Sequence, residues 1–342
     1  MRRTVWPLVF AAVATPAFML GACGSDDTVT PAPSDGGTDR TIPDAGDPIA
    51  RGKYLIDTAA VCSDCHTPRN ATGGPDSTRY LAGIDCFIGT DKVANPNAPG
   101  PGCLSSPNLT NDSTGLRNFT DQEIKNLFMH GVKPLNRGFL NSVMPYWVYA
   151  NFTDDDANAV VAYLRTVPAV AHESMANQAP WVDPPQAPPI DMNTVFAPAR
   201  EGNPNFDSQM RGRYLAATAG ACIECHTPET LPGQPDRTRW FAGRRVFDSR
   251  VMGLPPTYPA EIFAANLTSD ATGLAGYTVE QIVRALKSGL DNEGRGICPP
   301  MPAGPVGPYA NMTDNDATDI AQYLKALPPI ANERTDCVAP SP

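Results

Sequence analysis

The stretches CSDCH, at residues 62–66, and CIECH, at residues 222–226, decide the fold of this chain. In each, two residues separate the cysteines and a histidine follows the second cysteine directly. This spacing places both sulfurs within one helical turn, where they can add to the two vinyl groups of one porphyrin while the imidazole binds the iron. The motifs therefore predict two covalently bound c-type haems. The predicted cofactor-binding residues are Cys62, Cys65, His66, Cys222, Cys225 and His226.

The surrounding sequence repeats with the two motifs, which strengthens the prediction. A lone C-x-x-C is a weak signal, because zinc sites and thioredoxin-like sites also use it. Here the segments RGKYL, CHTP and NLT of the first half return as RGRYL, CHTP and NLT in the second half. Such repetition indicates a duplicated structural unit. We therefore predict one domain at residues 47–172 and another at residues 207–338.

Helix start and stop signals also recur. Asp47-Pro48 is a cap followed by proline at the first helical position, and Thr120 to Glu123 is a capping box. Long stretches rich in Gly, Pro and Asn separate these signals, and we expect them to wrap round a large apolar cofactor. The fold class is predicted to be mostly α with long irregular loops. Helices are expected from residue 47 toward residue 62, over 120–131, from 153 to before 168, over 278–289 and over 313–327.

Two Met-Pro pairs indicate the sixth iron ligands. Met144 and Met301 stand at corresponding positions between the second and third helices of each half. A thioether there would complete His/Met coordination and raise the reduction potential. One methionine alone is more often a gap filler in a core, but two aligned pairs favour the ligand role. Met129 and His130 align with Lys287 and Ser288, Met312 aligns with Phe152, and His172 has no counterpart. The predicted iron ligands are His66, Met144, His226 and Met301.

Two further features concern the surroundings of the haems. The carbonyl of Pro68 or Pro228 could accept a hydrogen bond from Nδ1 of the ligating histidine and fix its orientation. The pairs Arg79-Tyr80 and Arg239-Trp240 recur in the two halves. They could bind haem propionates or could be structural loop residues, and the sequence favours neither interpretation.

The amino-terminal sequence has the features of a targeting segment. Two arginines precede an apolar stretch that is too short to span a bilayer comfortably and ends in Leu20-Gly21-Ala22-Cys23, which resembles a bacterial lipobox. We predict a lipoprotein signal peptide at residues 1–22 and a lipidated, disordered tether at 23–46. An ordinary secretory leader is the alternative. Residues 173–206 contain Pro184-Pro185 and Pro188-Pro189 and are expected to form a semi-rigid, extended linker.

The composition indicates which class of partner and which cellular compartment to expect. The 342 residues carry a formal net charge of −10, which argues against nucleic acid and favours a partner with a basic patch. Nine cysteines are unusual for a reducing cytosol and indicate an oxidising compartment. We expect the mature chain on the periplasmic side of a bacterial membrane, lipid-anchored through Cys23.

Each half resembles a class I c-type cytochrome domain, since C-x-x-C-H, Asn-Leu-Thr, Gly-Leu and Met-Pro follow in the expected order. The tandem is similar to the multihaem cytochrome subunits of membrane-bound bacterial dehydrogenases, such as those for alcohols and gluconate. It departs from them in having two haem domains instead of three, a lipid anchor instead of a carboxy-terminal helix, and extra cysteines. The resemblance implies a dehydrogenase as electron donor and a cytochrome or oxidase as acceptor.

The remaining cysteines predict disulfides. With one cysteine assigned to lipid and four to haem, Cys86, Cys103, Cys298 and Cys337 remain, which allow three pairings. Domain separation favours Cys86–Cys103 and Cys298–Cys337.

Two function classes fit these features. An electron carrier has both irons saturated, whereas a dihaem peroxidase needs a haem with an open or displaceable ligand and a distal acid–base pair. The two Met-Pro pairs favour the carrier, which is not itself an enzyme. Binding of carbon monoxide to one haem would favour the peroxidase.

Overall fold

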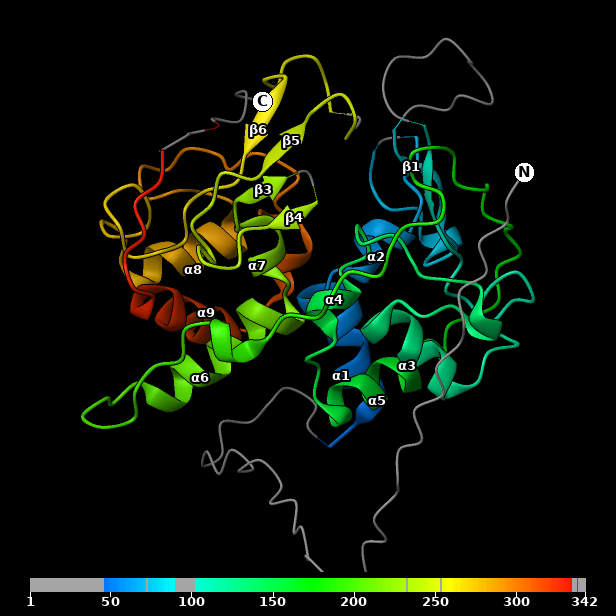
Figure 1. Cartoon of the computed structure of the whole chain (residues 1–342), viewed down its shortest axis with the longest axis horizontal. Coiled ribbons are helices and arrows are strands. Elements are labelled where there is room, and N and C mark those ends of the chain that lie inside the picture. Colours follow the sequence, from blue (N-terminus) through cyan, green and yellow to red (C-terminus); the bar gives the residue numbers. More distant parts are fainter. Residues whose placement is uncertain are drawn as a thin grey trace, which may run out of the picture. The chain divides into compact units, whose positions relative to one another are not determined.

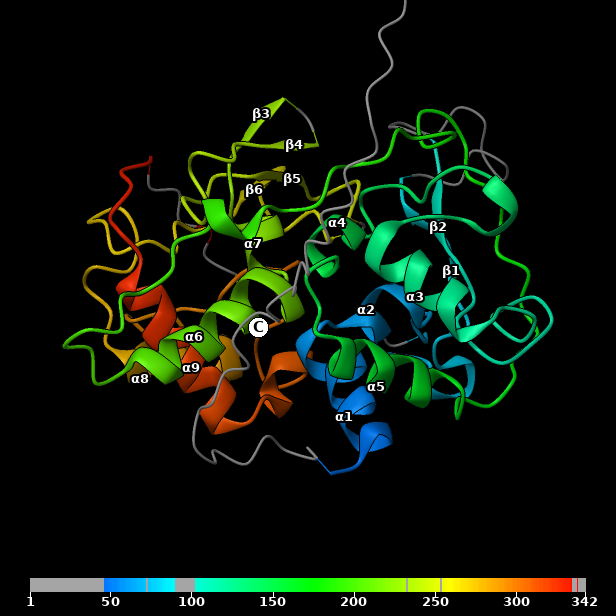
Figure 2. The same cartoon turned by 60° about the horizontal axis from the view of Figure 1, so that its bottom comes forward.

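Helix pairs form the framework of each half (Figures 1 and 2). The computed structural model describes residues 46–71, 73–89, 102–231, 233–252, 254–333 and 337. Helix α1 packs against α5 in the first half, and α6 packs against α9, which also contacts α8, in the second. The helices are α1 (Pro48–Tyr54), α2 (Cys62–His66), α3 (Asp121–His130), α4 (Tyr146–Tyr149), α5 (Asp154–Leu164), α6 (Phe206–Tyr214), α7 (Cys222–Cys225), α8 (Val279–Ser288) and α9 (Asp314–Ala326). Two π turns, η1 (Leu55–Ala59) and η5 (Leu215–Ala219), extend α1 and α6.

Glycines allow the close approach of these helix pairs. A Cβ atom on Gly52 of α1 would lie 2.0 Å from the carbonyl oxygen of Ala159 in α5. A Cβ atom on Gly212 of α6 would lie 1.9 Å from the carbonyl oxygen of Asp319 in α9. Both distances are far below van der Waals contact, so each helix pair requires glycine at this position.

The helix boundaries agree with the sequence signals. The side chain of Asp47 accepts a hydrogen bond from the backbone N–H of Ile49 at 2.9 Å and caps α1. Thr120 and Thr278 form complete capping boxes at the starts of α3 and α8. Gly131 ends α3 in the left-handed region, with φ of 67°. These helix predictions are confirmed.

Short strands within the loops were not predicted. Strand β1 (Ile84–Ile88) pairs antiparallel with β2 (Leu104–Ser106), and β5 (Val246–Asp248) pairs with β6 (Glu261–Phe263). A third antiparallel pair joins β3 (Glu229–Leu231) to β4 (Gln234–Pro235). Strands of two to five residues are too short to show a period in sequence. The 3₁₀ turns are η2 (Ser77–Arg79), η3 (Pro134–Asn136), η4 (Met192–Thr194) and η6 (Pro308–Asn311).

The two expected disulfides are present. Cys86, in β1, is bonded to Cys103, directly before β2, and Cys298 is bonded to Cys337. Each bridge therefore lies within one half of the chain, as domain separation predicted. By the loop-entropy model, a disulfide that closes a loop of this size adds roughly 3 kcal/mol to the free energy of unfolding.

Residues 173–205, most of the predicted linker, have little regular structure. Trp181 Nε1 donates to the carbonyl of Gly102 at 2.7 Å, which holds the first part of the linker on the first half. Trp240 Nε1 donates to Thr194 Oγ1 at 3.0 Å, which holds the second part on the second half. Side-chain contacts therefore fix the linker at both ends.

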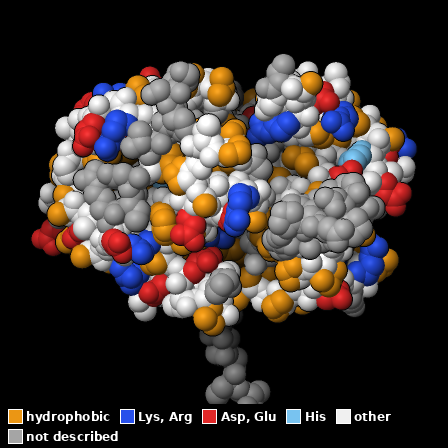
Figure 3. Space-filling view, turned by 90° about the horizontal axis from the view of Figure 1, so that it is seen from above, with side chains coloured by type: hydrophobic (Ala, Val, Ile, Leu, Met, Phe, Trp, Pro, Cys, Tyr) orange, Lys and Arg blue, Asp and Glu red, His pale blue; other side chains and the backbone are white. Residues whose placement is uncertain are grey.

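Apolar side chains of both halves form one continuous cluster. Residues Thr41–Pro342 accordingly form one compact unit. The predicted leader, Cys23 and most of the tether lie outside the described residues. Within the described part of the chain, no helix has the length and hydropathy needed to cross a bilayer. On the face seen in Figure 3, basic side chains are interspersed with acidic and hydrophobic ones.

Candidate functional site

A residue with a strained backbone lies directly before each C-x-x-C-H motif. Val61 and Ala221, directly before the first cysteine of each motif, both have φ of 47° and lie in the left-handed region. This conformation is unusual for residues other than glycine and is a true outlier for a β-branched side chain. It turns the chain sharply from the π turn η1 or η5 into the short helix α2 or α7. Strain of this kind clusters at functional sites.

The two histidines are held in the same way. His66 Nδ1 lies 2.8 Å from the carbonyl oxygen of Pro107, and His226 Nδ1 lies 2.8 Å from that of Ala265. Both side chains are buried, and burial lowers the pKa of each imidazole. A neutral imidazole that donates through Nδ1 has the lone pair of Nε2 available for a metal. The arrangement is the one that an iron-ligating histidine requires.

The prediction that Pro68 or Pro228 accepts this hydrogen bond is wrong. The carbonyl of Pro68 accepts from the N–H of Asp76 at 2.8 Å, and that of Pro228 accepts from Asp236 at 2.7 Å. Both carbonyls therefore hold the turn that follows the motif.

The acceptor comes instead from the residue before each Asn-Leu-Thr segment. Asn108 Oδ1 accepts from the N–H of Thr110 at 2.9 Å, while its Nδ2 donates to the carbonyl of Val170 at 2.8 Å. Asn266 makes the equivalent bonds to Thr268 at 2.9 Å and to Ile330 at 2.9 Å. The asparagine thus anchors the loop that brings the carbonyl to the histidine. The recurrence of Asn-Leu-Thr was the available sequence signal for this role.

None of the four motif cysteines is in a disulfide; Cys222 is buried, and Cys62, Cys65 and Cys225 are half-buried. Burial raises the pKa of Cys62 to about 12 and that of Cys222 to about 11. Burial also raises the pKa of Cys65 and Cys225, with further contributions from the carboxylates of Asp64 and Glu224. A thioredoxin-like site needs a lowered thiol pKa. The raised pKa of these thiols therefore argues against a thioredoxin-like site.

A tyrosine connects each Met-Pro segment to the neighbouring motif. Tyr149 of α4, soon after Met144, donates to the carbonyl of Ala60 at 3.0 Å. Tyr309 of η6, soon after Met301, donates to the carbonyl of Gly220 at 3.2 Å. Both tyrosines are buried, whereas the two methionines are half-buried and pack against the apolar cluster. The structure therefore brings each Met-Pro segment close to its motif. A tyrosine after each Met-Pro pair was the sequence signal for this contact.

The side chains in each half fit a c-type haem. In each half the two cysteine thiols could form the thioether bonds to a haem, and the histidine imidazole and the methionine thioether could bind its iron. Of the alternative ligands, Met312 is only 3% exposed within the core, and His130 lies exposed at the end of α3. His172, which has no counterpart in the second half, is half-buried, with Nε2 3.5 Å from Asp85.

The arginine–aromatic pairs have protein partners. Tyr80 OH donates to Asp57 at 2.5 Å, and Arg79 Nε lies 2.9 Å from Asp76. Arg239 donates to the carbonyl of Ala331 at 2.9 Å, in addition to the Trp240 contact with the linker. These contacts favour the structural-loop interpretation over propionate binding.

Comparison with known proteins supports the same cofactor. Residues 49–168 match the family described as Cytochrome c. The chain is 28% identical over 290 residues to the fructose dehydrogenase cytochrome subunit of Gluconobacter japonicus, covering 82% of this chain and 52% of that protein. It is also 28% identical over 290 residues to the gluconate 2-dehydrogenase cytochrome c subunit of Pantoea cypripedii, covering 82% and 59%. A diheme cytochrome c-type protein of Cereibacter sphaeroides is 26% identical over 291 residues, covering 82% and 86%.

The chain spans little more than half the length of the two dehydrogenase subunits. Their names describe cytochrome subunits of dehydrogenases, which agrees with the expectation of an electron-transfer protein that is not itself an enzyme. Residues 49–168 form a cytochrome c domain, in a chain that is similar to the cytochrome c subunits of bacterial dehydrogenases.

Proposed function

We propose that this chain is a dihaem c-type cytochrome that carries electrons between a dehydrogenase and a downstream acceptor. Its architecture would be two tandem class I cytochrome c domains, at residues 47–172 and 207–338. One haem would be held by Cys62, Cys65, His66 and Met144, and the other by Cys222, Cys225, His226 and Met301.

The matched geometry of the two histidines carries this proposal. Each imidazole is buried, and each has Nδ1 2.8 Å from a backbone carbonyl presented by an Asn-Leu-Thr loop. This contact fixes the tautomer and the ring plane and makes the imidazole a better ligand. Its occurrence in both halves supports two haems.

A bound c-type haem supplies a one-electron couple at its iron. The role of the surrounding residues is to hold that couple in place and to set its potential. The carbonyls of Pro107 and Ala265 orient the histidines. The Met144 and Met301 thioethers would raise the potential relative to a second imidazole.

Replacement of the two methionines tests the function. We expect Met144→Ala and Met301→Ala each to abolish the sulfur–iron charge-transfer band of one haem and to lower its potential by about 0.1 V or more, since axial ligands dominate haem potentials. Optical redox titration measures both effects. Met129→Ala is the matched control and should leave both haems unchanged. An unchanged band and potential in either test variant would exclude that methionine as ligand.

Carbon monoxide separates the carrier from the alternative, a dihaem peroxidase. In the carrier, protein side chains fill the ligand positions of both irons, so carbon monoxide should bind neither ferrous haem of the native protein. In Met144→Ala, carbon monoxide should bind one haem. Binding to one haem of the unaltered protein would favour the peroxidase, which needs an open or displaceable ligand.

The proposed location is the periplasmic side of a bacterial membrane, with the chain anchored by lipid on Cys23. The lipobox-like sequence before Cys23 supports this, as does the presence of disulfides, which persist in oxidising compartments. The names of the relatives support a dehydrogenase as electron donor. A cytochrome or oxidase would be the acceptor.

A further inference from the structure

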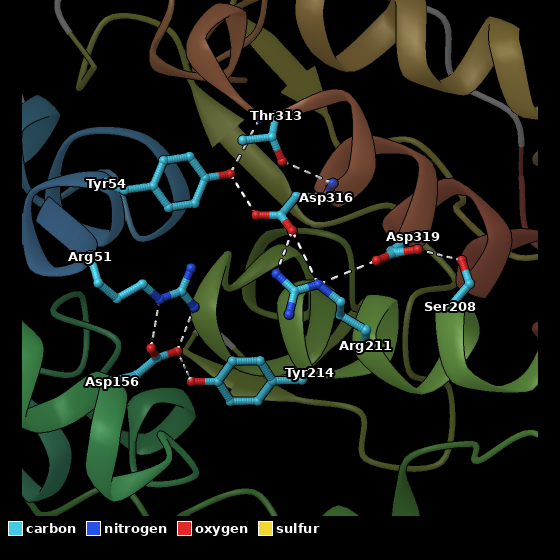
Figure 4. A network of polar contacts seen from close by, with 9 residues as sticks. All are labelled: Arg51, Tyr54, Asp156, Ser208, Arg211, Tyr214, Thr313, Asp316 and Asp319. Atoms are coloured by element: carbon cyan, nitrogen blue, oxygen red, sulfur yellow. Dashed lines mark hydrogen bonds and ion pairs between the residues drawn. The ribbon is translucent and has the colours of Figure 1, made fainter. Parts of the chain in front are cut away.

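A reciprocal pair of polar contacts joins the two halves of the chain (Figure 4). Tyr54, at the end of α1, donates its hydroxyl proton to Asp316 of α9 at 2.7 Å. Tyr214, at the end of α6, donates to Asp156 of α5 at 2.6 Å. Each half therefore contributes one tyrosine and accepts at one aspartate. We call these four residues the tyrosine–aspartate lock.

Each aspartate of the lock is already held by an arginine of its own half. Asp156 accepts from Arg51 through both oxygens, Oδ1 from Nε and Oδ2 from Nη2, each at 2.7 Å. Asp316 accepts from Nη2 of Arg211 at 2.7 Å. The arginine of the same half orients each carboxylate, so each tyrosine donates to an oriented, charged acceptor. Hydrogen bonds to charged groups are stronger than those between neutral groups.

The tyrosine hydroxyls also lie over the helix caps of the opposite half. The backbone N–H of Thr313, the N-cap of α9, points to Tyr54 OH at 3.4 Å. The N–H of Thr153, the N-cap of α5, points to Tyr214 OH at 3.5 Å. Each tyrosine therefore contacts both the cap and the third residue of the facing helix, which fixes its place along that helix.

Apolar contacts beside the lock lead toward the haem-binding motifs. The ring of Tyr214 packs edge-on against Phe152, with centroids 6.4 Å apart. The π turns η1 and η5, which follow Tyr54 and Tyr214 directly, contact each other. A Cβ atom on Gly220 would lie 3.7 Å from the carbonyl oxygen of Ala59. The chain enters each motif immediately after these turns, so the two motif-bearing segments meet at this interface.

We propose that Tyr54 and Tyr214 are positioning residues that set the register between the two haem-binding halves, and thereby the path for electrons between them. This inference rests on the proposed dihaem function. The lock acts in addition to the linker, because it joins α1 and α6, the helices that lead into the two motifs, to α9 and α5 of the opposite half. Among the described residues, the hydrogen bonds of the two hydroxyls all cross the interface, so removing the hydroxyls weakens the interface without removing a hydrogen bond within either half.

Conservative variants test the lock in the full-length holoprotein. Tyr54→Phe, Tyr214→Phe and the double variant remove only hydroxyl groups. Spin labels at Gln122→Cys and Glu280→Cys, exposed positions in the first turns of α3 and α8, report the distance between the halves. Electron equilibration between the haems after flash reduction is the second readout. Tyr80→Phe is the matched control, because its hydroxyl donates to Asp57 within one half.

Each single variant should shift the docking equilibrium toward separated halves by about 10-fold or more, as expected for loss of a hydrogen bond to a charged group. The double variant should broaden the label distances and slow internal equilibration by at least about tenfold, with the spectra of both haems retained. Tyr80→Phe should change neither readout.

A narrow, unchanged distance distribution in the double variant would overturn the lock. Broadened distances with an unchanged rate of equilibration would overturn its role in positioning the haems. If the unaltered protein shows no internal electron transfer, the dihaem carrier fails, and the label distances still decide whether the tyrosines join the halves.

Discussion

Arg51 and Arg211 occupy corresponding places in the two halves but have different neighbours. Arg51 is 7% exposed and forms a bidentate pair with Asp156. Arg211 lies between two carboxylates, with Nη2 2.7 Å from Asp316 and Nε 3.3 Å from Asp319. Asp319 takes the place of Ala159 in the first half, since each contacts the helix glycine. Among the described residues, Arg51 thus pairs with one carboxylate and Arg211 with two.

The difference shows that the two halves keep the same tyrosine–aspartate hydrogen bond while the residues around the aspartate differ. In both halves the aspartate at the third position of the last helix accepts from a tyrosine of the other half. In the second half Ser208 additionally donates to Asp319, which compensates part of the cost of a second buried carboxylate. We expect the docking contact to tolerate this change because the tyrosine bonds to Asp316 and not to Asp319.

The largest predicted difference between the halves is in the loss of stability when the aspartate at the third position of α5 or α9 is replaced. Asp156→Asn leaves Arg51 buried without a charged partner, which should lower the free energy of unfolding by about 3–5 kcal/mol. The matched Asp316→Asn leaves Arg211 paired with Asp319, so we expect a loss of only ~1–2 kcal/mol. Urea unfolding of the holoprotein measures both. Equal losses would show that Asp319 does not substitute for Asp316.

A smaller predicted difference concerns the charges beside the second cysteine of each motif. Arg245 pairs with Glu224, directly before Cys225, and lies 3.2 Å from Glu229 through Nε. In the first half Arg69 pairs with Asp64 at a more exposed position. The second motif therefore has the more buried ion pair, and changes there should act on one haem only.

Arg245→Gln removes this buried cation and should lower the potential of the second haem on the order of tens of millivolts, because nearby positive charge favours the reduced iron. The potential of the first haem should stay unchanged. Redox titration checks both, and Arg250→Gln, at an exposed arginine paired with Asp248, serves as control. A shift in the potential of the first haem, and not of the second, would contradict the placement of Arg245 beside the second haem.

Local signals in the sequence predicted the parts of the fold that depend on near neighbours. Asp47, Thr120 and Gly131 cap or end their helices as expected, because each acts on backbone groups within a few residues. The cysteine pairings also followed, since only the within-half pairs avoid crossing from one domain to the other.

Contacts between distant segments could not be predicted in the same way. The carbonyl of Pro107 reaches His66 across a long loop, whereas the sequence favoured the nearby Pro68. Tyr54 lies in the repeated segment RGKYL, and its hydroxyl partner Asp316 lies 262 residues away. The first pair forms only when the loop folds back onto the motif, and the second only when the halves dock, so no periodicity in the separate segments indicates them.

The number of covalent haems tests the central claim most directly. Intact-mass spectrometry of the protein extracted from membranes should give a chain that begins at Cys23, carries acyl lipid and holds two haems. A variant with Cys222→Ala and Cys225→Ala should hold one haem. A native chain with one haem or none would contradict the account.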